Sequence, residues 1–189
     1  CTAGIGTGWS SQVPCYNPLQ IIQEIRNWLD KRDEKDEKDE DKDLSPWYRG
    51  FTGVIEKAGK NKYVTKGSIE KKMVRSTQKV IVNELPVYLW IDKFKESIED
   101  LVEEKKIKGY KNNSSDVVVN FEIDEIKGDN EFECNEDTLG LVSTLSTNNM
   151  VLFNKDGEIT KYESVYDILN EFCKVRYDCY VKRKEYIIN

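Results

Sequence analysis

The glycine-rich run at the start of the chain, Gly4-Ile5-Gly6-Thr7-Gly8-Trp9-Ser10-Ser11, is the first stretch whose residue types could do chemistry. Small residues let backbone N–H groups approach a phosphate closely, so such a loop is a candidate anion-binding site. The signal is weak here, because no Lys-Ser or Lys-Thr pair follows the last glycine and Pro14 prevents a helix from starting directly after the loop. These glycines therefore do not by themselves favour phosphate binding.

What the loop does offer is a single bulky apolar residue, Ile5, between Gly4 and Gly6. An isoleucine on a glycine hairpin is costly to expose unless an apolar site receives it, and the gap between two stacked base pairs is one such site. The alternative is that Ile5 fills a local core. The residues alone leave both interpretations open.

The sequence lacks some of the residues and motifs on which nucleophilic and metal-assisted catalysis commonly depends. There is no histidine, which excludes serine–histidine and cysteine–histidine hydrolases and removes the commonest nitrogen ligand of metals. The cysteines form no Cys-x-x-Cys pair, so neither a zinc site nor a disulfide framework is indicated; they are Cys1, Cys15, Cys134, Cys173 and Cys179. No apolar run approaches the ~20 residues needed to cross a bilayer. We expect a reduced intracellular compartment, no membrane partner and, since the chain opens at Cys1, a piece of a longer protein.

The charge of the chain is segregated, which the net value of −6 hides. Asp30–Asp43 holds nine acidic and five basic residues, Lys57–Lys79 holds one and eight, and Val80–Gly140 holds sixteen and seven. A chain that is acidic overall can still present one local basic face, and local fields steer polyanions more than net charge does. The basic segment Lys57–Lys79 is either such a face or a plain solvated face of a sheet.

The elements that must position these residues are helices and strands in alternation. Apolar residues at helical spacing predict a helix over Leu19–Leu29, with Asn17 as its N-cap, and another over Tyr88–Lys106. A third helix starts near Ser164 and runs to the end of the chain. Asp30–Asp43 has no apolar residue to offset the entropy of ordering, which predicts a disordered insertion, with a charged helix as the alternative.

Short β-type segments fill the rest of the chain. Alternating apolar and polar residues between turn residues predict strands over Phe51–Glu56, Lys62–Lys66, Gly67–Lys72, Gln78–Asn83 and Asp116–Asp124. The apolar runs Met150–Phe153 and Glu158–Tyr162, joined across Asp156-Gly157, predict a β-hairpin. The fold class is therefore α/β of the α+β kind, with antiparallel strands packed against helices.

Several blocks of sequence, taken together, carry a family resemblance. They are Gly4-Ile5-Gly6-Thr7-Gly8-Trp9-Ser10; Glu84-Leu85-Pro86-Val87 with Trp90 and Phe94-Lys95-Glu96; Asn148-Asn149-Met150-Val151-Leu152-Phe153; and Tyr162-Glu163 followed by Val165, Asp167-Ile168-Leu169, Phe172, Arg176, Tyr180 and Arg183-Lys184-Glu185. In order and spacing these blocks resemble the DNA-cleavage core of eukaryotic-type type II DNA topoisomerases, and they span nearly the whole chain.

The resemblance implies a domain organisation. Residues 1–29 would form a DNA-bending loop and first helix, 30–43 a disordered acidic insertion, 44–163 the α+β tower or shoulder domain, and 164–189 the first turns of a long coiled-coil helix. The insertion would point away from DNA, because its charge repels the duplex; lying against the basic segment is the alternative.

The resemblance also implies which residues meet DNA. Ile5 matches the wedge that the family inserts between base pairs to bend the duplex. A second stretch aligns with residues that lie along DNA, where hydroxyl, amide and backbone N–H groups can contact phosphates; it comprises Gly140, Leu141, Val142, Ser143, Thr144, Leu145, Ser146, Thr147, Asn148 and Asn149. Gly140 departs from the family, which tends to carry a lysine at this position. Lys57–Lys79 would form an outer track for the arms of the bent duplex.

The reaction of the family is implied to lie outside this chain. The catalytic tyrosine, the metal-binding acidic module and the nucleotide-binding module are upstream in the family, so no catalytic or metal-ligating residue is assigned here. The intact enzyme would use Mg²⁺ and ATP, bind double-stranded DNA, form a homodimer and work in the nucleus. Two other interpretations compete with this DNA scaffold. The first is a protein-interaction module in which the basic and acidic blocks bind partners and Ile5 is buried. The second is a complete small hydrolase, which the lack of histidine and of a close carboxylate pair disfavours.

Overall fold

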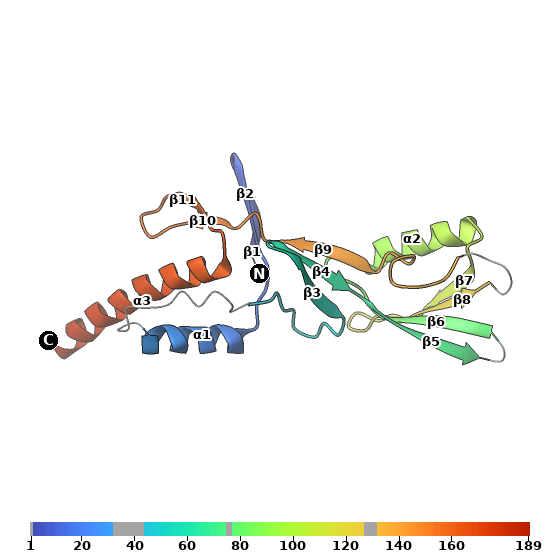
Figure 1. The fold of residues 1–189 in the computed structure, drawn as a ribbon, viewed down its shortest axis with the longest axis horizontal. Coiled ribbons are helices and arrows are strands. Elements are labelled where there is room, and N and C mark those ends of the chain that lie inside the picture. The colour runs from blue at the N-terminus through green and yellow to red at the C-terminus, as the bar shows by residue number, and fades with distance from the viewer. Residues whose placement is uncertain (1, 32–43, 75–76, 127–131) are drawn as a thin grey trace. The chain divides into compact units, whose positions relative to one another are not determined.

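A computed structural model describes residues 2–31, 44–74, 77–126 and 132–189 of the chain. The chain divides into two compact units (Figure 1). The first unit combines Cys1–Arg49 with Ser146–Asn189, and the second unit is Gly50–Leu145. The predicted fold class is confirmed, since antiparallel sheets and helices make up both units and a long helix closes the chain.

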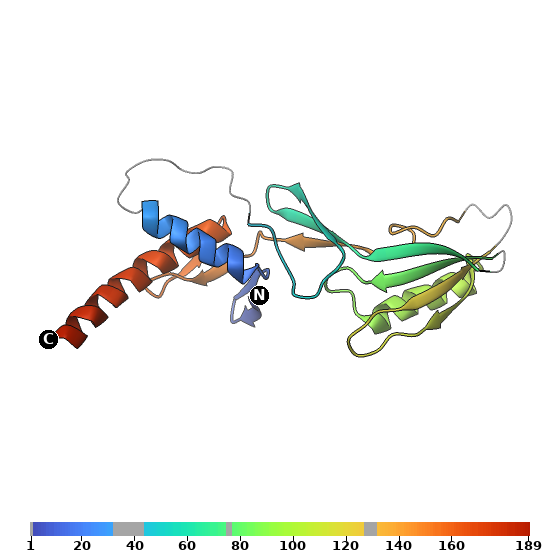
Figure 2. The same cartoon turned by 90° about the horizontal axis from the view of Figure 1, so that it is seen from below.

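In the first unit, the described residues form two small hairpins and two helices. Its elements are β1 (Thr2–Gly6), β2 (Trp9–Val13), α1 (Pro18–Lys31), β10 (Val151–Phe153), β11 (Ile159–Lys161) and α3 (Val165–Ile188). Strand β1 pairs antiparallel with β2, and β10 pairs antiparallel with β11. Helix α1 lies beside α3 (Figures 1 and 2), where the rings of Trp28 and Tyr177 are 6.3 Å apart.

The ends of these helices follow from their capping residues. The Asn17 side chain accepts a hydrogen bond from the backbone N–H of Leu19 at 3.0 Å, as the sequence predicts for an N-cap. At the start of α3, the Ser164 hydroxyl accepts from the Asp167 N–H while the Asp167 carboxylate accepts from the Ser164 N–H, a reciprocal capping box. Both predicted helices are confirmed. Helix α1 also includes Asp30 and Lys31, so the predicted disorder does not begin at Asp30; residues 32–43 of the insertion lie outside the described residues.

In the second unit, the described residues form two antiparallel sheets and one helix. A three-stranded sheet has the order β3 (Val54–Gly59), β4 (Lys62–Lys66), β9 (Val142–Ser146). A four-stranded sheet has the order β5 (Ser68–Val74), β6 (Thr77–Glu84), β8 (Phe121–Glu125), β7 (Ile107–Asn112). Helix α2 (Ile91–Glu103) follows β6 along the chain and leads into β7.

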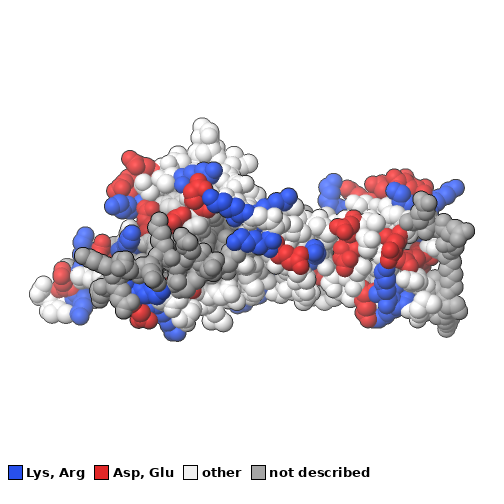
Figure 3. Space-filling view, in the orientation of Figure 1, with Lys and Arg blue, Asp and Glu red and all other residues white. Residues whose placement is uncertain are grey.

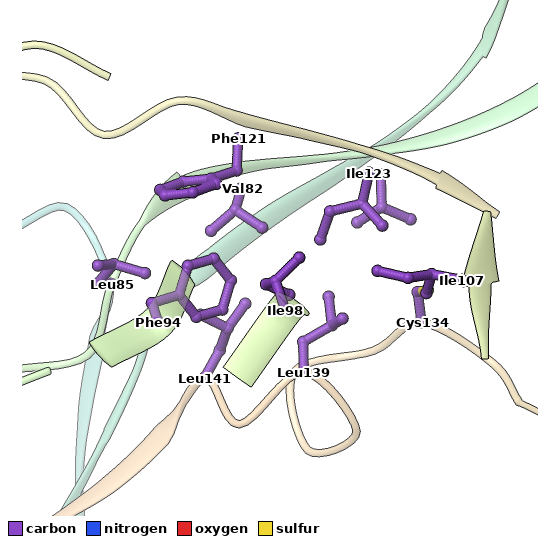
Figure 4. Packing of buried hydrophobic residues seen from close by; sticks show 11 residues of the cluster. Val82, Leu85, Phe94, Ile98, Ile107, Phe121, Ile123, Cys134, Leu139 and Leu141 are labelled. Atoms are coloured by element: carbon purple, nitrogen blue, oxygen red, sulfur yellow. The ribbon is translucent and has the colours of Figure 1, made fainter. Parts of the chain in front are cut away.

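The core of the second unit lies between α2 and the four-stranded sheet (Figure 4). Alternate residues of a strand point to the same face, so Val80 and Val82 of β6 lie on one face, opposite Ile123 and Phe121 of β8. Helix α2 contributes Phe94 and Ile98, both fully buried. The rings of Phe94 and Phe121 meet edge to face with their centroids 5.0 Å apart. Leu85, Ile107, Cys134, Leu139 and Leu141 complete the cluster.

Helix α2 is shorter than the predicted Tyr88–Lys106. Tyr88 has a positive φ of 71° and Trp90 is extended, so the chain turns before the helix begins at Ile91. At the other end Lys105 has a φ of 58°, the left-handed conformation that ends many helices. The apolar spacing therefore identified the helix, and local backbone turns shorten it at both ends.

The predicted strand over Asp116–Asp124 is wrong in its first half. Only Phe121–Glu125 forms a strand, while the Ser115 N–H donates to the Val118 carbonyl oxygen in a turn and Val117 is 89% exposed. Strand β7 was not predicted, because Gly109 and the following asparagines indicate a loop when they are considered alone. In the structure Gly109 is paired with Asp124 of β8 next to a bulge.

Candidate nucleic-acid interface

Ile5 is presented to solvent at the outer end of the β1–β2 hairpin. Its side chain is 93% exposed, so the alternative that it fills a local core is wrong. Ile5 lies opposite Ser10 in the strand register. No residue of the described hairpin, Thr2–Val13, carries a charge, and the hairpin projects beyond β10 and β11 of the same unit (Figures 1 and 3). An exposed isoleucine on an uncharged hairpin is suited to enter an apolar gap.

The glycines around Ile5 differ in what the structure requires at each position. Gly8 has a φ of 82° in the turn between the strands, a backbone conformation that residues other than glycine rarely adopt. At Gly6 a Cβ atom would lie 2.7 Å from Nε1 of Trp9, so the indole ring covers this position and excludes a side chain. At Gly4 a Cβ atom would meet nothing within 4 Å. The glycine-rich run therefore builds a tight hairpin in the structure, and a phosphate cradle is not needed to explain it.

Strand β2 of this hairpin is attached to the chain that leads into β10. The Asn149 amide Nδ2 donates to the Ser10 hydroxyl at 2.8 Å, and the Gln12 N–H donates to the Asn149 carbonyl oxygen at 2.8 Å. The Trp9 ring meets the Phe153 ring edge to face, with centroids 5.7 Å apart. These contacts join residues about 140 positions apart in sequence, and no local pattern predicts them.

The predicted DNA-lining stretch Gly140–Asn149 contains strand β9 and its flanks. Its exposed residues are Gly140, Thr144, Ser146 and Asn148, while Val142, Ser143 and Asn149 are half-buried. Leu141 and Leu145 are buried in the second unit, so their side chains support the strand and only their backbone can face a ligand. Thr147 is also buried, which leaves its hydroxyl the least accessible of the hydroxyl and amide groups in the stretch.

Gly140 is explained by the turn that precedes β9. Its φ is 68°, and it ends a turn closed by hydrogen bonds from the N–H groups of Leu139 and Leu141 to the carbonyl oxygens of Asn135 and Glu136. Glycine adopts this left-handed conformation without steric cost. Glycine therefore suits the backbone conformation at this position.

The basic segment Lys57–Lys79 is largely neutralised within the second unit. Lys66 pairs with Glu56 at 2.7 Å, Lys71 with Glu133 at 2.8 Å, and Lys72 with Glu70 at 3.0 Å. Lys79 lies between Glu122 at 3.2 Å and Asp124 at 3.3 Å, and these hydrogen bonds raise its pKa. Acidic and basic side chains are accordingly interspersed over this unit (Figure 3). Of the two interpretations of this segment, these ion pairs favour a solvated face of a sheet for these lysines.

Two lysines of the segment keep their charge accessible. Lys60 and Lys62 lie at the turn between β3 and β4, both exposed, and neither makes an ion pair within the described part of the chain. Any phosphate track along this segment therefore has its strongest candidates at this turn.

Glu171 ties the β10–β11 hairpin to α3. Its carboxylate accepts hydrogen bonds from the Tyr162 hydroxyl at 2.7 Å and from the Lys155 backbone N–H at 2.6 Å. The hydrogen bond to Glu171 raises the pKa of Tyr162 to about 12, and the same bond lowers the pKa of Glu171. The hairpin that carries Phe153 is thus fastened to the long helix.

The carboxylate and thiol groups of the described residues are the ones that metal binding and thiol chemistry would use. No three carboxylate or thiol side chains gather to hold a metal ion in residues 2–31, 44–74, 77–126 and 132–189. Burial raises the pKa of Cys134 to about 12 and raises that of Cys173, so neither thiol is an activated nucleophile. Within the same residues, no helix is both long and apolar enough to span a bilayer.

Comparisons with known proteins identify the family that the chain resembles. The family model for the A subunit of DNA gyrase/topoisomerase IV matches residues 1–189. DNA topoisomerase 2 of Invertebrate iridescent virus 6 is 38% identical over 188 residues, which are 99% of this chain and 16% of the viral protein. DNA topoisomerase 2 of Penicillium chrysogenum is 35% identical over 190 residues, 97% of this chain and 11% of the fungal protein.

A solved structure extends the similarity to three dimensions. The crystal structure of the Plasmodium falciparum topoisomerase II DNA-binding, cleavage and re-ligation domain matches with a TM-score of 0.82 and 36% identity, covering 98% of this chain and 25% of that one. The chain thus spans less than a fifth of the length of the viral and fungal relatives. The resemblance predicted from the sequence blocks is confirmed, and the chain belongs to the type II DNA topoisomerase family that includes DNA gyrase and topoisomerase IV.

Proposed function

We propose that this chain is a DNA-binding and DNA-bending scaffold within an ATP-dependent type II DNA topoisomerase, with Ile5 as the residue that enters the base stack. The observation that carries the proposal is the 93% exposure of Ile5 on a hairpin without charges. The relatives named DNA topoisomerase 2 and the Plasmodium DNA-binding, cleavage and re-ligation domain support the DNA partner.

The cost of unstacking a base step can be compared with the free energy that burial of Ile5 contributes. Unstacking one base step costs about a few kcal/mol. Burying an isoleucine side chain contributes roughly 1.5–3 kcal/mol. The wedge therefore offsets the unstacking only in part, and contacts between the bent duplex and the exposed polar groups of the stretch, Thr144, Ser146 and Asn148, supply the remainder. Such contacts carry no sequence readout, as strand passage at many sites requires.

The bond-making steps belong to other parts of the proposed enzyme. In the family a tyrosine attacks a phosphodiester reversibly, Mg²⁺ assists the leaving oxygen and ATP hydrolysis drives strand passage. The resemblance places the metal-binding acidic module in another part of the enzyme, so we assign no metal-dependent step to the residues of this chain. We expect it neither to cleave nor to relax DNA by itself.

Dimerisation and location are further parts of the proposal. The last turns of α3 carry exposed apolar residues, with Tyr186 86%, Ile187 68% and Ile188 71% exposed, which supports pairing of this helix with another in a coiled coil. We propose a homodimer on this ground. The nuclear location that the family resemblance implies stays a prediction.

The competing function is a protein-interaction module without a DNA role. Duplex affinity measured at several salt concentrations separates the two, because a protein that neutralises phosphates releases counterions on binding. We expect the affinity to fall linearly with salt on logarithmic axes. Affinity that does not depend on salt would favour the protein-interaction module.

A further inference from the structure

The β1–β2 hairpin needs external support if Ile5 is to act as a wedge. An isolated two-stranded hairpin is marginally stable at best in water. A hairpin that moves freely would also lose conformational entropy when it enters the base stack, and this cost makes insertion less favourable. The contacts that hold the hairpin therefore decide how much of the interaction free energy reaches the DNA.

Strand β2 is held on both of its faces. Trp9 and Ser10 are consecutive, so their side chains leave the strand on opposite faces. Trp9 packs edge to face on Phe153, and Ser10 accepts a hydrogen bond from Asn149. Both partners come from the segment Asn149–Phe153, which therefore brackets the strand.

The contact at Ser10 is the one placed to control Ile5. Ser10 is the direct register partner of Ile5, so the Asn149 amide holds the strand directly across the hairpin from the wedge. The Asn149 carbonyl oxygen accepts from the Gln12 N–H two residues further from the tip. One residue thus fixes the hairpin through its side chain at the position of the wedge and through its backbone behind it.

We infer that Asn149 is a positioning residue for the Ile5 wedge, acting through Ser10. The inference rests on the proposed function of Ile5. It also changes the role that the sequence assigns to Asn149, which is a phosphate contact, because its amide is bonded to the hairpin. Residues Asn149 and Ser10 set the fraction of molecules in which Ile5 is directed at the base stack, and they contribute little to duplex affinity.

The test measures DNA bending in the full-length polypeptide that carries this chain. A short duplex with donor and acceptor dyes at its ends reports the ratio of bent to straight DNA, and a separate titration reports duplex affinity. Asn149→Ala and Ser10→Ala should each lower the bent-to-straight ratio about fivefold, the factor that corresponds to the net contribution of one hydrogen bond, about 1 kcal/mol. The duplex affinity from the titration should change by a smaller factor than the bent-to-straight ratio.

The double variant and a matched control make the test specific. Ser10→Ala and Asn149→Ala remove the same bond from its two ends, so the double variant should bend DNA no less than either single variant. Ser11→Ala makes the same chemical change one residue along, at a buried hydroxyl that has no hydrogen-bond partner in the described residues, and should leave the bending ratio unchanged. Should Asn149→Ala fail to fold, Ser10→Ala tests the same bond with Asn149 intact.

Ile5→Ala measured in parallel separates the two ways of failing. Unchanged bending by Ile5→Ala would overturn the proposed function. Loss of bending by Ile5→Ala together with normal bending by both Ser10→Ala and Asn149→Ala would overturn only the positioning role. Additive losses in the double variant would also overturn it, since the two side chains would then act separately.

Discussion

At the residue scale, the packing of the β1–β2 hairpin depends on a glycine, Gly6, that has no side chain. Gly6 lies under the Trp9 indole ring, which in turn contacts Phe153, so the absence of a Cβ atom lets the ring pack across the strands. Ile5 next to it is almost fully exposed. The sequence marked this run as unusual, but it did not distinguish a phosphate loop from a hairpin, because that distinction depends on the ring of Trp9 and its distant partner.

Gly6→Ala should therefore displace the Trp9 ring and destabilise the hairpin. A Cβ atom at this position would lie 2.7 Å from Nε1 and 2.9 Å from Cε2 of Trp9, closer than real contacts allow. Overpacking of this kind typically costs about 1–3 kcal/mol. Amide hydrogen exchange of the β2 N–H groups measures the local stability, and we expect faster exchange in the variant.

Gly4→Ala is the matched control on the same strand. Its added Cβ atom would meet nothing within 4 Å, so exchange in β2 should stay as in the parent protein. Equal acceleration by both substitutions would mean that the Trp9 contact at Gly6 does not govern the stability of the hairpin.

At the element scale, the β10–β11 hairpin contacts the β1–β2 hairpin and is itself attached to α3. The sequence predicted the β10–β11 hairpin and α3, because the Asp-Gly turn and the apolar spacing are local signals. Their attachment through Tyr162 and Glu171 was not predictable, since it joins two side chains whose partners are settled only by the fold. The same limit explains β7, whose Gly109 indicates a loop until β8 is present to pair with it.

The Tyr162–Glu171 bond should make stability depend on pH in two directions. The pKa of Glu171 is lowered from 4.5, so its contribution is present above that value and is lost as pH falls through the folded pKa. The pKa of Tyr162 is raised from 10.0 to about 12, so its contribution is complete below pH 10 and is lost as pH rises through about 12.

Tyr162→Phe should accordingly reduce the unfolding free energy most between these limits. The difference from the parent protein, measured by urea unfolding, should form a plateau between about pH 5 and 10 and shrink on either side. Tyr186→Phe, in α3, removes only the hydroxyl of an 86% exposed tyrosine and keeps the apolar ring proposed for the coiled coil, so it should give no difference at any pH. A Tyr162→Phe difference that persists undiminished at low pH would show that lost packing, not the hydrogen bond, is responsible.

At the scale of the whole molecule, charges that the sequence separates are brought together among the described residues of the second unit. Most acidic residues of Val80–Gly140 that pair with the basic segment lie on neighbouring strands, so the fold neutralises what the linear sequence separates. The fold class and most elements were predictable from local patterns. The charge pairing was not, because it depends on the order of strands β5–β6–β8–β7.

Phosphate contacts of the basic segment are therefore expected from Lys62 and its neighbour Lys60. Lys62→Gln should reduce the slope of logarithmic affinity against logarithmic salt by about 0.9, the value for one lost phosphate contact. Lys66→Gln, in the same strand, removes a lysine already held by Glu56 and should change the slope less. Equal slopes for the parent and the Lys62→Gln protein would remove this turn from the DNA interface.

The central claim is that Ile5 separates stacked bases, and a fluorescent base analogue placed at the bend site tests it most directly. The emission of such an analogue rises when it loses its stacking partner. We expect the full-length polypeptide to raise the emission on binding, and Ile5→Ala to bind the duplex with little change in affinity while leaving the emission close to that of free DNA. An equal rise in emission with Ile5 and with alanine at this position would contradict the claim.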